Sequence, residues 1–104
     1  MKAELYNYKA WVAESTPQAL KELGNDLLEA CKFEVLGFME HHFQPQGYTC
    51  LWLLGESHLA IHTYPEHSKS YIELTSCVAS KNMAFKDLLF AKVDVLTNEF
   101  TVSA

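Results

Sequence analysis

Hydrophobic residues recur along this chain with two different spacings, which predict strands in some segments and helices in others. A spacing of two runs through the first segment and predicts a strand over Glu4 to Val12, with one face made by Tyr6, Tyr8, Ala10 and Val12. Helical spacing follows at Leu20, Leu23, Leu27, Leu28 and Cys31. Because Ser15-Thr16-Pro17 is a typical helix start, we expect a helix from Pro17 to about Lys32, which Gly24 weakens slightly.

The rest of the chain is dominated by short apolar runs of strand length. We expect strands over 33–43, 48–54, 57–64 and 71–77, a turn at Pro45-Gln46-Gly47 and a polar loop over 66–70. A second helix is expected to be capped by Asn82 and to bury Phe85, Leu88 and Leu89, before a last short strand at Phe100–Val102. This order predicts an α+β two-layer sandwich, in which two helices cover one face of a mainly antiparallel sheet. The other face needs cover, which a homodimer would supply.

Composition narrows the class of protein. The 104 residues suit a single domain, 1–104, and 49% hydrophobic with 20% charged residues is typical of globular proteins. No apolar run approaches the about 20 residues that cross a bilayer, and the N-terminal segment lacks the apolar core of a signal peptide, so we expect a cytoplasmic protein without a membrane partner. The net charge is −5 and every basic residue is a lysine, which argues against nucleic acid as a partner.

Residues able to do chemistry gather in the segment 55–66. Ser57 follows Glu56, His58 and His62 follow on, and the thiol of Cys77 comes twenty residues after Ser57. A serine hydroxyl at a tight turn can attack its own preceding carbonyl carbon and convert the amide to an ester. If a base then removes the serine Cα proton, the ester is eliminated, the chain is cut, and the residue left behind hydrolyses to a pyruvoyl group. This sequence of steps needs a turn, a donor for the carbonyl oxygen and a base.

More ordinary interpretations of the same residues have to be weighed. Three cysteines without a C-x-x-C spacing indicate free thiols, and we expect Cys31 and Cys50 to be small core residues. His58 and His62 would share one face of a strand, and with His41 and His42 they could suggest zinc. Because neither C-x-x-C nor H-E-x-x-H is present, we predict no metal site.

Three segments of the sequence together resemble one family. These are Glu56-Ser57-His58-Leu59-Ala60-Ile61-His62-Thr63-Tyr64-Pro65-Glu66, the Ser76-Cys77-Val78 element after it, and His41-His42-Phe43-Gln44-Pro45-Gln46-Gly47 before it. They resemble the prokaryotic S-adenosylmethionine decarboxylase proenzymes, which are small self-cleaving pyruvoyl enzymes. The family pattern reads E-S-H-L-x-I-H-T-[aromatic]-P-E, with H-x-F-x-P-x-G before it and T-C-G after it. Thr49 stands where the family usually has serine, Tyr64 where it has tryptophan, and Val78 where it has glycine.

The resemblance implies a role for each matching residue. Ser57 would become the pyruvoyl cofactor through cleavage between Glu56 and Ser57, which would give chains 1–56 and 57–104. His62 and Thr49 would assist this processing, and Cys77 would protonate the product carbanion. The substrate-binding residues would be an aromatic pair that holds adenine and a carboxylate near the ribose hydroxyls: Phe43, Tyr64 and Glu66.

The activity implied is decarboxylation of S-adenosylmethionine through a Schiff base, which supplies the aminopropyl donor for spermidine biosynthesis. Two other hypotheses stay open at this point. One is a pyruvoyl-dependent decarboxylase whose substrate has switched to ornithine or arginine. The other is an uncleaved relative that serves as a binding or regulatory protein.

Overall fold

The computed structural model describes residues 4–103, which form six strands, two α-helices and one short 3-10 helix. In chain order these are β1 (Leu5–Val12), α1 (Pro17–Ala30), β2 (Val35–His42), β3 (Tyr48–Leu54), β4 (Ser57–Tyr64), η1 (Pro65–His67), β5 (Lys69–Ser76), α2 (Ala79–Lys92) and β6 (Val95–Ser103). The strands form one sheet in the order β2-β3-β4-β5-β1-β6, in which every neighbouring pair is antiparallel.

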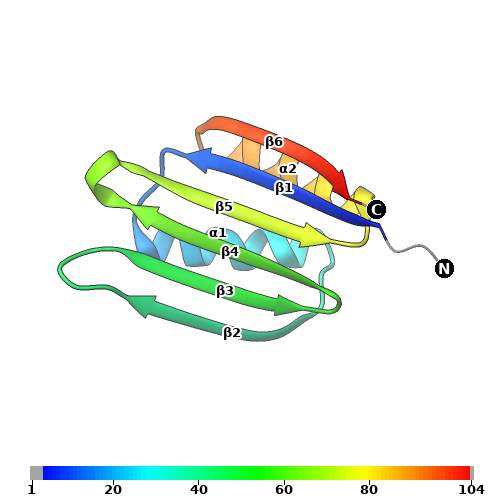
Figure 1. The fold of residues 1–104 in the computed structure, drawn as a ribbon, viewed down its shortest axis with the longest axis horizontal. Helices are drawn as coiled ribbons and strands as arrows, with labels where there is room; N and C mark the ends of the chain where they lie inside the picture. Colours follow the sequence, from blue (N-terminus) through cyan, green and yellow to red (C-terminus); the bar gives the residue numbers. More distant parts are fainter. Residues whose placement is uncertain (1–3, 104) are drawn as a thin grey trace.

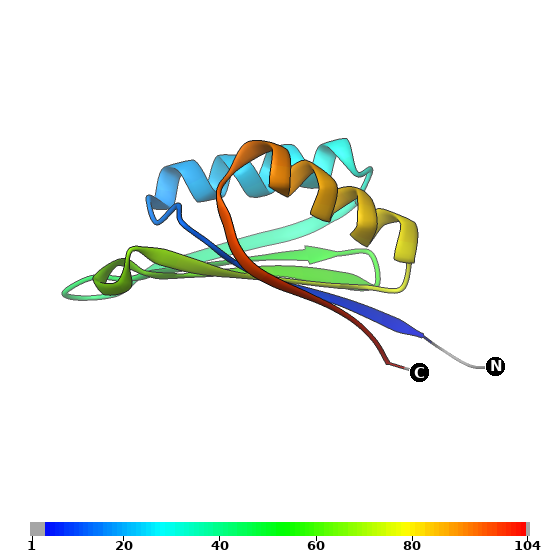
Figure 2. The same ribbon diagram turned by 90° about the horizontal axis from the view of Figure 1, so that it is seen from above.

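The architecture is a two-layer α+β sandwich, as the alternation of helical and strand periods predicts. Figure 1 shows the helices behind the sheet, and Figure 2 shows that both lie on the same side of it. The other side, which we call the open face, is not covered by any helix or strand of residues 4–103. The predicted fold class is therefore confirmed, and the reason is that β1, β3 and β5 bury alternate residues, which lie on only one of their two faces.

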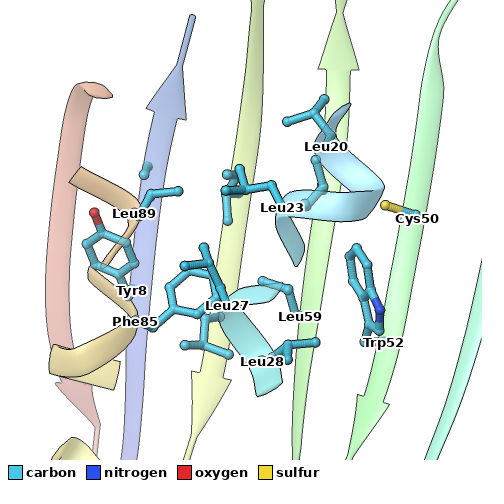
Figure 3. Packing of buried hydrophobic residues seen from close by; sticks show 14 of the residues in the cluster. Tyr8, Leu20, Leu23, Leu27, Leu28, Cys50, Trp52, Leu59, Phe85 and Leu89 are labelled. Atoms are coloured by element: carbon cyan, nitrogen blue, oxygen red, sulfur yellow. The ribbon is translucent and has the colours of Figure 1, made fainter. Parts of the chain in front are cut away.

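The helix-covered face holds the core, in which Trp52 of β3 lies against Gly24 and Asn25 of α1. Trp52 is 1% exposed, lies 4.9 Å from the ring of Phe38, and donates a hydrogen bond from Nε1 to Asn25 of α1 at 2.9 Å. Figure 3 shows the leucines of α1 and Phe85 of α2 reaching toward the same layer. Gly24 lets α1 approach this indole ring, because a Cβ at that position would lie 2.3 Å from the Trp52 ring.

We predict that Gly24→Ala destabilises the protein, although glycine to alanine in a helix normally stabilises by about 1 kcal/mol. The added methyl group would overlap a ring held by packing and by a hydrogen bond, and such overpacking costs about 1–3 kcal/mol. Urea unfolding followed by circular dichroism should show a lower midpoint. Gly37→Ala is the matched control with an unchanged midpoint, since its Cβ would meet only Leu53 Cβ at 3.8 Å. A rise in stability of Gly24→Ala would contradict the packing argument.

Several element boundaries differ from the expectations. α2 begins at Ala79, so Asn82 is not its cap; it is fully buried and donates from Nδ2 to the Tyr6 carbonyl at 2.9 Å. β6 spans nine residues instead of three, because it pairs with β1 along its whole length. The expected loop over 66–70 is shorter, since η1 and the start of β5 occupy most of it. α1 ends at Ala30, two residues before the expected end.

Candidate active site

The peptide between Glu56 and Ser57 lies in a two-residue turn between β3 and β4. Ser57 is the first residue of β4 and pairs with Leu54, the last residue of β3. Glu56 adopts a φ of +59°, in the left-handed region that costs a side-chain-bearing residue energy. The turn is anchored to the segment before β2, because the Gly55 N–H donates a hydrogen bond to the Glu34 carbonyl at 3.1 Å. The predicted cleavage position thus falls on a strained and anchored turn.

Cys77 lies beside this turn, at the end of the neighbouring strand β5. The β4–β5 ladder pairs His58 with Thr75, and the same register, continued by two residues, sets Glu56 opposite Cys77. The Sγ atom of Cys77 lies 3.7 Å from Glu56 Oε2, and the side chain is exposed. Ser76 holds the backbone around the thiol, because its Oγ accepts from the Val78 N–H at 3.1 Å. Val78, which stands where the family pattern has glycine, therefore lies in a tight turn next to the exposed Cys77.

His62 and Thr49 form a second group, also on the open face. They are cross-strand partners on β3 and β4, and Thr49 Oγ1 lies 3.0 Å from His62 Nδ1 in a hydrogen bond. On its other side the imidazole ring of His62 stacks on Tyr71, with centroids 6.3 Å apart and an interplanar angle of 25°. The ring is therefore held from both flanks, which leaves Nε2 as its free nitrogen.

These two groups lie at opposite ends of the sheet. Ser57 and His62 are five residues apart along β4, which is about 17 Å at the rise of an extended strand. In Figure 1 the turn between β3 and β4 and the end of β5 lie together, and the loop between β2 and β3 and the end of β4 lie at the far end. Within one chain, the structure brings Cys77 to Glu56, the residue before Ser57, whereas His62 and Thr49 lie at the other end of β4.

The predicted substrate-binding residues all lie at the end of the sheet that holds His62. Phe43 follows β2, Tyr64 ends β4 and Glu66 is exposed in η1. Phe43 packs against His41 with ring centroids 4.5 Å apart, and Tyr64 packs against Trp11 at 5.5 Å. Each ring of the expected aromatic pair therefore has another aromatic neighbour.

An aromatic cluster beside His62 was missed by the sequence reasoning. Trp11 lies 5.2 Å from Tyr71 and 5.5 Å from Tyr64, and the Lys69 ammonium lies 4.5 Å above the Trp11 ring. The alternation in β1 could have put Trp11 on the open face, because Tyr8, Ala10 and Val12 occupy the other phase. The alternation within β1 does not show which strands pair with β1.

The open face also carries an exposed apolar groove across β2 and β3. It has a volume of about 480 Å³, and Met39 and Leu53 in its lining are 66% and 59% exposed. Leu51 and Gly37 lie between them on the same face. Apolar side chains gathered in this way on one face are typical of a surface that another protein covers.

We predict that alkylation of the native protein modifies Cys77 alone among the three thiols. Cys31 and Cys50 are buried as expected, and burial raises the pKa of Cys31 and raises that of Cys50 to about 11. At pH 8 both therefore remain shielded thiols, and the thiolate is the reacting form. One adduct of iodoacetamide should be found by mass spectrometry, and it should map to Cys77. Two or three adducts without denaturant would contradict this packing.

Among residues 4–103, no group of three or more histidine, cysteine, aspartate or glutamate side chains is arranged to hold a metal ion. Within the same range, no helix has the length and apolar character required to span a membrane.

Comparisons with known proteins place the fold and the motifs in one family. The family model described as S-adenosylmethionine decarboxylase matches residues 1–102. The S-adenosylmethionine decarboxylase proenzyme of Brevibacillus brevis is 45% identical over 58 residues, which cover 56% of this chain and 44% of that protein. The proenzyme of Prochlorococcus marinus is 37% identical over 71 residues, covering 68% and 50%. The matched segments thus span about half the length of these relatives.

A solved structure supports the fold independently of the motifs. The adenosylmethionine decarboxylase from Aquifex aeolicus superimposes with a TM-score of 0.79 at 20% identity, and the match covers 97% of this chain and 88% of that one. The match of the family model to nearly the whole sequence shows the relationship, and the expected resemblance is confirmed. This chain belongs to the S-adenosylmethionine decarboxylase family.

Proposed function

We propose that this protein is a self-cleaving, pyruvoyl-dependent decarboxylase that acts on S-adenosylmethionine and so supplies the aminopropyl donor for spermidine biosynthesis. The observation that carries the proposal is the turn at Glu56-Ser57, where a positive φ at Glu56 coincides with an exposed thiol from the next strand. Family membership supports the same chemistry. We further propose that residues 1–104 are one domain, which cleavage would divide into chains 1–56 and 57–104. The pairings β3–β4, β1–β5 and β1–β6 would hold these two chains together.

Cleavage would begin when the Ser57 hydroxyl attacks the Glu56 carbonyl carbon and the peptide nitrogen leaves, which converts the amide to an ester. A base then removes the Cα proton of Ser57. The ester carboxylate departs as the leaving group and becomes the C-terminal backbone carboxylate of Glu56. The remaining residue takes up water and loses ammonia to become a pyruvoyl group. Relief of the left-handed φ at Glu56 would favour the first step.

The residues around the turn fit such a group. The pyruvoyl carbonyl would condense with the substrate amine and accept electrons as carbon dioxide leaves. We propose that Cys77, which directly follows the adjacent strand β5 and is exposed beside the turn, donates the proton. We propose that Phe43 and Tyr64 hold the adenine ring and that Glu66 binds the ribose hydroxyls, because these three side chains lie at one end of the sheet.

We also propose that the active enzyme is a homodimer whose two sites are each built from both chains. His62 and Thr49 are too far from Ser57 of the same chain to act on it. If two open faces pack around a two-fold axis that runs across the strands, the Ser57 end of one sheet meets the His62 end of the other. The exposed Met39, Leu51 and Leu53 would then be buried, which gives such a dimer its hydrophobic contact.

The direct test has two arms. The intact mass of the purified protein should show two chains, cut before Ser57, of which the second reacts with a carbonyl reagent at its N-terminus. The cleaved protein should then release carbon dioxide from carboxyl-labelled S-adenosylmethionine and not from ornithine or arginine. A single uncleaved species would refute the enzyme proposal and favour a binding or regulatory protein. Release from ornithine or arginine alone would refute the proposed substrate.

A further inference from the structure

The contact between Glu56 and Cys77 joins the residue before the cleavage site to the thiol. Cys77 Sγ and Glu56 Oε2 are 3.7 Å apart, within the range of a hydrogen bond that a thiol donates to a carboxylate. Both residues continue the open face, since His58 and Thr75 are the last paired residues before them. The two side chains therefore meet on the open face, next to the Glu56-Ser57 turn.

Both partners in this contact are held by their backbones. Glu56 adopts a φ of +59°, and the preceding Gly55 donates its N–H to the Glu34 carbonyl. On the other side, Ser76 Oγ bonds to the Val78 N–H and donates to the Val78 carbonyl, which closes a turn around Cys77. Because the Gly55 anchor lies before the cleaved bond, it would still hold Glu56 near the thiol after cleavage.

We infer that Glu56 has a second function after cleavage and is the positioning residue of the Cys77 thiol. This inference rests on the proposed decarboxylase activity. The Glu56 carboxylate accepts the S–H hydrogen, which fixes the direction in which the sulfur points. A proton donor has to face the carbanion when the carbanion forms. In turnover the proton passes from Sγ to the carbon that lost carbon dioxide, and water then restores the proton to the thiolate.

The contact itself can be tested without any enzymatic activity. In a Ser57→Ala background, which cannot cleave, Glu56→Gln should raise the rate of alkylation of Cys77 by iodoacetamide about three- to tenfold at pH 7, because the sulfur is no longer held on the carboxylate. Glu34→Gln is the matched control: Glu34 is an exposed carboxylate beside the same turn, and its rate should stay at that of the Ser57→Ala protein. An equal rate in the Glu56→Gln and control proteins would overturn the inference, whatever the function of the protein.

The consequence for turnover is tested in the cleaved enzyme. Glu56→Gln should still cleave, as the intact masses will show, but its kcat per cleaved chain should fall about tenfold with KM unchanged. Glu56→Asp should restore part of the lost kcat, because it keeps a carboxylate on a side chain that is one methylene group shorter. An unchanged kcat in Glu56→Gln would overturn the positioning role. A fall in kcat that Glu34→Gln reproduces would overturn it as well, since the effect would then come from the turn.

Discussion

Coexpression of Ser57→Ala with His62→Ala should restore a cleavage that neither variant performs well alone. Ser57→Ala has no nucleophile and stays intact, and loss of the base in His62→Ala should slow cleavage by about 10²- to 10⁴-fold. In a mixed dimer, one site combines Ser57 of the His62→Ala chain with His62 of the Ser57→Ala chain. With equal expression and random pairing, about half of the His62→Ala chains should be cleaved.

This expectation follows from the length of β4, because a strand is too stiff to bring its ends together. Ser57 and His62 are held about 17 Å apart by pairing with β3 and β5 on both sides. Intact masses of the purified mixture will report which chain is cut. As a control, Ser57→Ala coexpressed with the double variant Ser57→Ala/His62→Ala should give no cleavage. Failure of complementation, with mixed dimers present, would place the processing base within the same chain.

Cys77→Ala is expected to separate the two proposed activities, self-cleavage and decarboxylation. Cleavage should proceed, because none of its steps needs the thiol, whereas decarboxylation per cleaved chain should fall by about 10²-fold or more with the loss of the proton donor. The exposed position of Cys77 means that the substitution leaves the core intact. Cleavage is measured from intact masses, and turnover from carbon dioxide release.

Cys31 offers a matched control for that experiment. It is a thiol buried in the core, so Cys31→Ala should cost some stability and leave turnover per cleaved chain unchanged. If Cys77→Ala released carbon dioxide as fast as the unaltered protein, another group would have to donate the proton. If it failed to cleave, the thiol would take part in processing through its contact with Glu56.

Local patterns predicted the secondary structure well where burial and backbone preference agree. β3 and β4 were predicted with their observed bounds, because each is short, apolar and ended by turn residues. β6 was underestimated, since most of its side chains are exposed and its stability comes from pairing with β1. Asn82 looked like a cap from its residue type, but a buried bond to the Tyr6 carbonyl put it inside α2. Both misses depend on partners that are distant in the sequence.

The sequence by itself determined the fold class and the family, and it proposed a set of candidate site residues, because these depend on residue types and on spacings within short segments. It could not determine where those residues lie relative to one another. Ser57 and His62 look adjacent in the motif, yet an extended strand separates them, and Glu56 and Cys77 look remote, yet the β4–β5 register makes them neighbours. The tertiary structure alone decided this, because strand pairing converts distance along the chain into position on the sheet.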